Sequence, residues 1–212
     1  MAVTALQIVL MAFLVLAAGL LTALGLGQRR HRGQLARLAE QLGLRLSARD
    51  FMNLPARYAR CLLMQAGHNG YAQNVVFGRL KNNFLRAFDY RFEVGHGPHR
   101  QSCRLTVVAA ETQRQRPAAA VWREIPAAAA LLCMDGLAAG PDGSRWVGDE
   151  ACAHELTAAW PGRLGPVTLL TAGRAVLAAC PGRLAQQGLE DLLRAATEWV
   201  ERLEGSSPPG SV

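Results

Sequence analysis

The chain has 212 residues and a formal net charge of +7, from 23 basic residues against 16 acidic ones. It contains no nucleotide-binding G-x-x-x-x-G-K-[ST] or G-x-G-x-x-G motif, no zinc-protease H-E-x-x-H motif and no hydrolase G-x-S-x-G motif, so the enzyme classes built on them lack support. Its five cysteines are widely separated and form no C-x-x-C pair, and we expect neither a metal nor a cofactor.

The first part of the chain predicts a helix that spans a membrane. Residues 1–28 carry no charged side chain, and residues 3–26 are dominated by Leu, Ala, Val, Ile, Phe and Met. At 1.5 Å per residue such a run reaches about 36 Å, which is enough to cross a hydrocarbon core of about 30 Å with some tilt. A cleaved signal peptide is the alternative, but it needs a basic N-terminal region and a shorter apolar run.

Positive charge lies on only one side of this segment, because Arg29, Arg30, Arg32 and Arg37 follow it and no basic residue precedes it. The positive-inside rule then places the N-terminus outside and the rest of the chain in the cytoplasm, at a bacterial inner membrane. Unpaired cysteines agree with a reducing compartment. We expect these four arginines to contact anionic lipid headgroups. We expect no nucleic-acid partner, since the other charges are spread along the chain.

The hydrophobic pattern divides the chain into four regions. Residues 1–28 are the transmembrane anchor, and residues 29–43 form a basic juxtamembrane helix that stops at Gly43. Residues 44–204 form one soluble α+β domain, and residues 205–212 a disordered tail. The domain is large enough for a core of its own.

Three successive stretches with alternating side chains predict an antiparallel sheet, at residues 74–80, 84–94 and 100–111. Turns are expected at residues 81–83 and 95–98. Along the middle stretch aromatic side chains share one face and charged ones the other, as a sheet with two different faces requires.

The second and third stretches also predict a register. If Glu93 pairs with Arg100, then Asp89 falls opposite Arg104. Both faces of the hairpin then match, since apolar residues also meet apolar ones.

Farther along the chain we expect a polar loop at residues 113–117 with a return strand after it, and a helix at residues 149–160. Residues 167–171 and 175–179 flank a glycine and predict a second hairpin. The last helix has the clearest period of 3.6, with its apolar residues inward: Leu189, Leu192, Leu193, Ala196, Val200 and Leu203.

Three side chains are candidates for catalysis. Asp89, between two aromatic residues, could act as a general base, and Arg91 of the same stretch could clamp an anion. His68 in a glycine-rich stretch could line a site beside the sheet. Cys152 precedes His154, but a spacing of two residues on a helix points the two side chains apart. The simpler interpretation of each is structural.

Two histidines lie in or next to the expected turn at residues 95–98, His96 and His99. They lack the further ligands that a metal site needs.

The strings Asn-Val-Val-Phe-Gly at residues 74–78 and Phe-Asp-Tyr-Arg-Phe at residues 88–92 follow an apolar N-terminal segment and a Leu-Gly-Leu stretch. In this combination the chain resembles a group of bacterial membrane-anchored proteins whose domains have no known function. The resemblance covers residues 1–110. It implies a single N-terminal membrane helix and assigns no activity, cofactor or site residue.

We therefore expect a single-pass membrane protein whose cytoplasmic domain is a non-enzymatic binding or scaffolding module. Two alternatives remain open. A membrane-tethered enzyme of unfamiliar type gains support if Asp89 and His68 share a pocket, and loses it if Asp89 is merely paired with Arg104. A sensor of anionic lipid surfaces would bind through residues 29–37.

Overall fold

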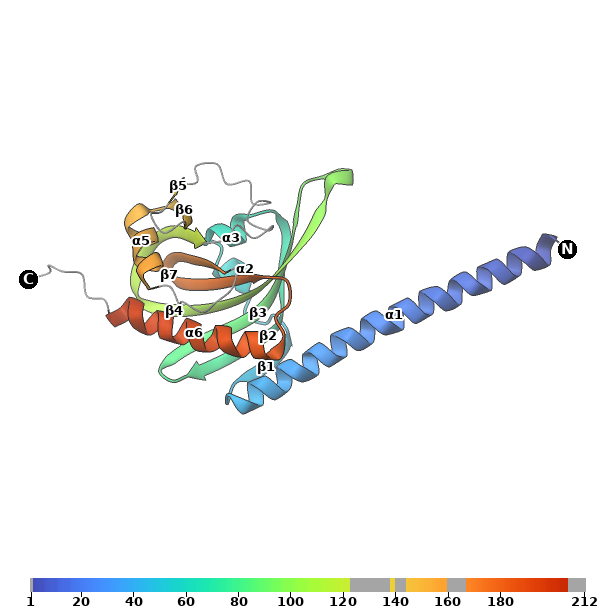
Figure 1. Ribbon diagram of the computed structural model, residues 1–212, viewed down its shortest axis with the longest axis horizontal. Helices are drawn as coiled ribbons and strands as arrows, with labels where there is room; N and C mark the ends of the chain where they lie inside the picture. The colour runs from blue at the N-terminus through green and yellow to red at the C-terminus, as the bar shows by residue number, and fades with distance from the viewer. Residues whose placement is uncertain (1, 123–137, 140–143, 160–166, 206–212) are drawn as a thin grey trace, which may run out of the picture.

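The computed structural model describes residues 2–122, 138–139, 144–159 and 167–205. Over these residues the chain has the predicted α+β fold, with a long N-terminal helix, an antiparallel sheet of seven strands and a C-terminal helix (Figure 1). The tail expected to be disordered lies, from residue 206 onward, outside the described residues.

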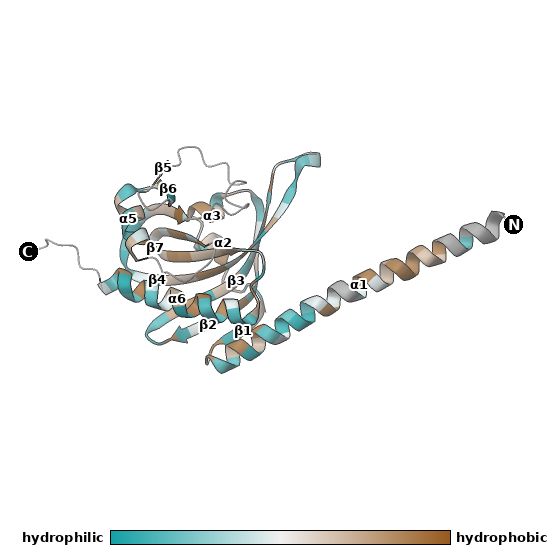
Figure 2. Ribbon diagram, viewed as in Figure 1, coloured by the Kyte–Doolittle hydropathy of each residue, from teal (hydrophilic) through white to brown (hydrophobic). Residues whose placement is uncertain are grey.

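Helix α1, Ala2–Gln41, runs without a break from the apolar segment into the domain, where two helices were expected. Its last turns bury Leu35, Leu38 and Ala39 against the sheet. The preceding part projects away from the domain and includes a hydrophobic stretch (Figure 2). The large apolar side chains that the structure describes there are exposed. By length and composition this helix could cross a membrane, since its apolar window has a mean hydropathy of 2.3 and none of it is buried.

The sheet is antiparallel throughout and is organised around its longest strand, β4. Strands β1, β2, β3 and β4 are neighbours in that order; β6 pairs with the far part of β4 and with β5, and β7 pairs with β4 over most of its length. The bounds are β1 Arg45–Arg49, β2 His68–Leu80, β3 Asn83–Val94, β4 Gln101–Trp122, β5 Ala138–Ala139, β6 Arg145–Gly148 and β7 Thr168–Pro181.

A predicted loop and a predicted turn lie inside long strands. The polar residues 113–117 do not form a loop but lie within β4, and Gly173 does not turn the chain into a hairpin but lies within β7 with a φ of 63°. Arg116 pairs with Gly173, and the register shifts on both sides of this pair. The extra residues belong to β4, since Glu111 and Arg116 are five positions apart and their β7 partners only two. This irregularity bends β4 without ending its pairing with β7.

The register between β3 and β4 differs by two residues from the predicted one. Asp89 is paired with Thr106, and Val94 with Gln101, because a 3-10 turn at Gly97–His99 lengthens the loop between the strands. A shift of two residues keeps every side chain on its face. For this reason Arg104 still reaches Asp89, diagonally across the pair.

Two apolar cores lie on the two faces of the sheet. On one face pack α5 (Glu150–Ala158), α6 (Gln186–Gly205) and the last turns of α1; the other carries the short helices α2 (Leu54–Arg57) and α3 (Leu62–Gln65) (Figure 1). All six apolar residues predicted to face inward on α6 are buried. Burying a leucine side chain stabilises the fold by about 1.5–3 kcal/mol.

We expect Leu38→Ala to lower the free energy of unfolding by about 2–4 kcal/mol, because Leu38 is fully buried between α1 and the sheet. The measurement is urea unfolding of the full-length protein in a neutral detergent. Arg37→Ala, at the exposed neighbouring position, is the control and should change stability by less than about 0.5 kcal/mol. Equal stability of the two variants would show that α1 is not held by this contact.

Candidate functional site

A buried carboxylate lies where α1 meets the sheet. Asp89 is on β3, on the face that α1, α5 and α6 cover, and only 5% of its side chain is exposed. An ionised carboxylate at such a position is expensive unless hydrogen bonds and opposite charges surround it. Its partners therefore define the site.

The partners of Asp89 come from four different parts of the chain, and all of them approach Oδ2. Asn74 of β2 donates from Nδ2 at 2.7 Å, and Arg104 of β4 donates from Nη2 at 2.8 Å. Nε2 of His31 lies 3.6 Å away and Nε of Arg183, after β7, lies 4.0 Å away. The last two contacts are too long for hydrogen bonds and act through charge and dipole.

These surroundings keep Asp89 ionised. Burial by itself would raise the pKa of the carboxyl, but the approach of His31, the hydrogen bond from Asn74 and the charge of Arg104 outweigh it and hold the pKa below its ordinary value.

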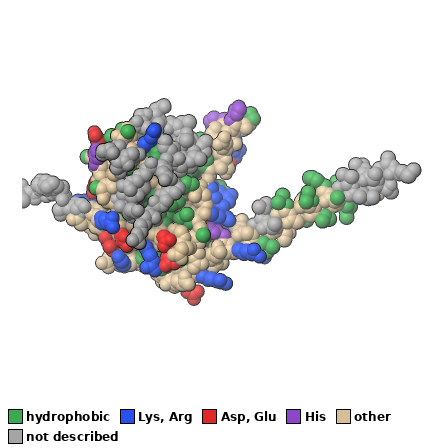
Figure 3. Space-filling view, in the orientation of Figure 1, with side chains coloured by type: hydrophobic (Ala, Val, Ile, Leu, Met, Phe, Trp, Pro, Cys, Tyr) green, Lys and Arg blue, Asp and Glu red, His purple; other side chains and the backbone are tan. Residues whose placement is uncertain are grey.

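Two more arginines belong to the same group of side chains. Arg32 of α1 donates from Nε to Oδ1 of Asn74 at 3.0 Å. Arg91 of β3 stands opposite Arg104 in the sheet register. We call the whole set the junction cluster: His31, Arg32, Asn74, Asp89, Arg91, Arg104 and Arg183. Figure 3 shows basic side chains gathered beside the point where α1 leaves the domain.

The junction cluster holds more positive than negative charge. The set contains four guanidinium groups and one carboxylate, and the buried Nε atoms of Arg91, Arg104 and Arg183 have no hydrogen-bond acceptor among the described residues. Burial lowers the pKa of Arg183, and the charge of Arg104 lowers it further. The cluster thus has donors and charge that the described part of the chain does not satisfy.

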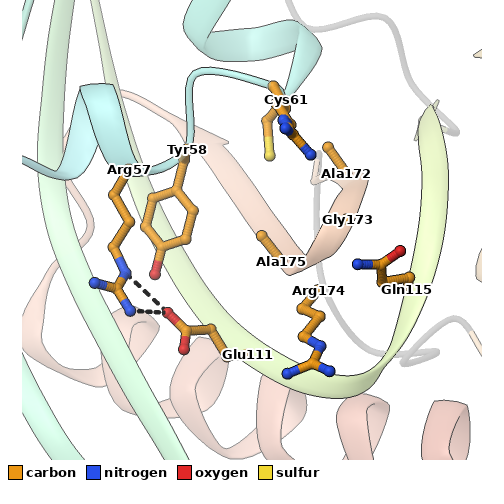
Figure 4. A pocket seen from close by; sticks show the side chains of 10 residues that line it. Arg57, Tyr58, Cys61, Glu111, Gln115, Ala172, Gly173, Arg174 and Ala175 are labelled. Carbon is orange, nitrogen blue, oxygen red and sulfur yellow. Dashed lines mark hydrogen bonds and ion pairs between the residues drawn. The ribbon is translucent and has the colours of Figure 1, made fainter.

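A hollow of about 300 Å³ opens on the other face of the sheet, beside α2 (Figure 4). Its walls include Arg57, Arg60 and Arg174, and Glu111, which accepts from Arg57 at 2.7 Å and from Arg86 at 3.0 Å. This carboxylate is already neutralised by its two arginines. Nearby, burial raises the pKa of the Cys61 thiol to about 12, so no activated nucleophile lines this hollow among the residues described.

The structure does not bring the three catalytic candidates together. His68 pairs in register with Glu93, four residues along β3 from Asp89, and its Nε2 lies 3.9 Å from that glutamate. The thiol of Cys152 is buried in the core under α5 and lies 3.1 Å from the Thr171 hydroxyl. Burial raises the pKa of Cys152, and no group of three or more metal-ligating side chains occurs in the described ranges.

The four arginines predicted to contact lipid separate into two groups. Arg32 turns toward the domain and joins the junction cluster, whereas Arg29, Arg30 and Arg37 are exposed. Sequence reasoning proposed Arg91 as an anion clamp but missed Arg183 as a member of a site. The strand alternation did place Arg91 on the face of Asp89, but nothing in the sequence connects Arg183 to it.

We expect Asp89→Asn to lower the free energy of unfolding at pH 7 by about 2–4 kcal/mol, since it leaves the arginines of the junction cluster without their counter-charge. Because the folded-state pKa of Asp89 is depressed, the wild type has this stability fully above the ordinary value of 3.8 and loses it as the pH falls through the folded-state pKa. Asp89→Asn should therefore be less sensitive to acid.

The measurement is chemical unfolding of the full-length protein between pH 3 and 7, with the exposed Asp191→Asn as the control of equal charge. If both variants matched the wild type in stability and in pH dependence, the carboxylate would not hold the junction together.

No family model matches this chain, and no curated protein matches it in sequence. Among solved structures, the fold is similar to the crystal structure of the mycobacterial trehalose monomycolate transport factor A, with a TM-score of 0.59. The two chains are 14% identical, and the match covers 86% of this chain and 99% of that one. At this identity the likeness shows the fold, which the two proteins share over nearly the whole of the transport factor's chain.

Proposed function

We propose that the protein is a single-pass membrane protein of a bacterial inner membrane, whose cytoplasmic domain is a non-enzymatic scaffold for a transport process. The observation that carries this proposal is the construction of α1. One helix contains both the exposed apolar segment and the turns that pack on the sheet, so the domain is held at the membrane surface by a rigid element.

The exposed half of α1 supports the membrane location. Large apolar side chains such as Leu16, Leu20 and Leu21 are more than half exposed, and a soluble protein rarely leaves so continuous an apolar surface uncovered. A bilayer is the environment in which such a helix has all its backbone groups satisfied and its side chains solvated.

The scaffold role has two supports. The fold is similar to that of a transport factor, a name that refers to transport and to no catalysed reaction. In addition, the candidates Asp89, His68 and Cys152 are each engaged in separate local contacts, and a catalytic constellation needs its groups to converge.

A reporter cysteine tests the orientation. We expect Glu198→Cys on the exposed face of α6 to react with a membrane-impermeant thiol reagent only after the cells are opened, whereas Ala2→Cys should react in intact cells. The four described cysteines are buried and give little background, and Cys133→Ser removes the fifth. Labelling of Glu198→Cys in intact cells would reverse the topology.

A partner experiment tests the scaffold role. We expect crosslinking in intact cells, followed by purification in detergent, to enrich an integral membrane transport protein with the full-length chain. The control is residues 1–28 fused to an unrelated soluble protein, which keeps the anchor and removes the domain. Equal recovery with both, together with turnover of a substrate by the purified full-length protein, would contradict a scaffold and favour an enzyme.

A further inference from the structure

Under the proposed anchoring, the junction cluster lies at the depth where a membrane presents phosphate groups. His31 and Arg32 follow the uncharged segment, which ends at Gln28, by about one helical turn, and a turn rises about 5.4 Å. Since α1 is continuous here, this part of the domain is held close to the end of the apolar segment. Under the proposed anchoring, the cluster faces the headgroup region of the leaflet nearest the domain.

The arrangement of its arginines is unfavourable without a ligand. Arg91 and Arg104 stand opposite each other in the sheet, where like charges repel, and Asp89 neutralises only one of the four guanidinium groups. Three buried Nε atoms also lack an acceptor among the described residues. An anion with several oxygens would relieve both problems at once, because guanidinium groups bind phosphate through pairs of parallel hydrogen bonds.

We propose that the junction cluster is a binding site for a phosphate group, supplied by the headgroup of an anionic phospholipid or by a free phosphate. Arg91, Arg104 and Arg183 hold the oxygens, and Arg32 adds charge from the helix side. Asp89 fixes the positions of Arg104 and Asn74 without saturating the cluster. The lipid source rests on the proposed membrane anchoring, whereas the phosphate site itself does not.

This site differs from general attraction of the basic segment to a membrane. Arg29 and Arg30 are exposed, so their attraction to anionic lipid acts over a distance and is screened by salt. The arginines of the junction cluster are half-buried, which favours direct and saturable binding. A pair of variants of equal charge separates the two.

The test uses the full-length protein in a neutral maltoside detergent. Its thermal unfolding midpoint is followed while short-chain phosphatidylglycerol, phosphatidylcholine or inorganic phosphate is titrated. The test variant is Arg91→Gln with Arg183→Gln, which leaves the Arg104 contact to Asp89 intact. The control is Arg29→Gln with Arg30→Gln. It removes the same amount of charge from the part of α1 next to His31 and Arg32.

We expect saturable binding of phosphatidylglycerol by the wild type and at least about tenfold weaker binding by the test variant, since it loses charge-assisted hydrogen bonds. The control should stay within about threefold of the wild type. Inorganic phosphate that binds with the same dependence on Arg91 and Arg183 would support the site and identify a soluble ligand. Equal weakening in both double variants would overturn the proposal. So would the absence of saturable binding of both phosphatidylglycerol and inorganic phosphate.

Two further readouts separate binding from folding. Without ligand, the test variant should be as stable as the wild type or more stable, because it removes like charges that face one another. Arg91→Lys keeps the charge but loses the paired hydrogen bonds, and it should also bind phosphatidylglycerol more weakly. Wild-type affinity in Arg91→Lys would contradict direct binding by this guanidinium. All of these measurements are made in detergent, so they do not depend on how the chain sits in a cell membrane.

Discussion

The position of α1 against the sheet depends on one buried carboxylate and the apolar contact beside it. Asp89 accepts from β2 and β4 and lies 3.6 Å from His31 of α1, while Leu35 and Leu38 of the same helix face are buried one and two turns farther on. Polar and apolar contacts thus hold the helix at two levels. The hydrogen bond from Arg32 of α1 to β2 supplies direction, because its geometry is specific, and the leucines supply most of the free energy.

A second buried charge supports the bend of β4, away from the junction with α1. Arg116 is buried at the irregular part of β4, opposite Gly173 of β7. Its Nη2 lies 3.1 Å from Glu155 of α5 and donates to the Leu203 carbonyl of α6 at 2.9 Å. One guanidinium therefore ties the bend to both helices on that face. Since a buried charge without these partners would be costly, the bulge and the two helices have to form together.

The sequence predicts correctly those elements that a local hydrophobic periodicity determines. The apolar run of α1, the alternation along β3 and the amphipathic face of α6 each follow from one periodicity, and each forms as predicted. The errors concern features that only long-range pairing decides. Gly173 and the polar residues near Arg116 are typical of turns, and they remain inside strands because β4 and β7 continue to pair on both sides of them. The junction cluster was out of reach for the same reason, because Arg183 approaches Asp89 only after α1, β3, β4 and the end of β7 have packed.

A continuous helix also restricts what the domain can do at a membrane. A flexible linker would let the domain turn freely, and any of its surfaces could meet the bilayer or a partner. Because α1 is continuous through Gln28 and held at Leu38, the same face of the domain points toward the apolar segment. Under the proposed anchoring, the excess positive charge of that face would meet the phosphate groups of the bilayer, whereas the hollow beside α2, on the other face of the sheet, would stay open to partners. A fixed orientation of this kind would let one small domain use different faces for a membrane and for a partner.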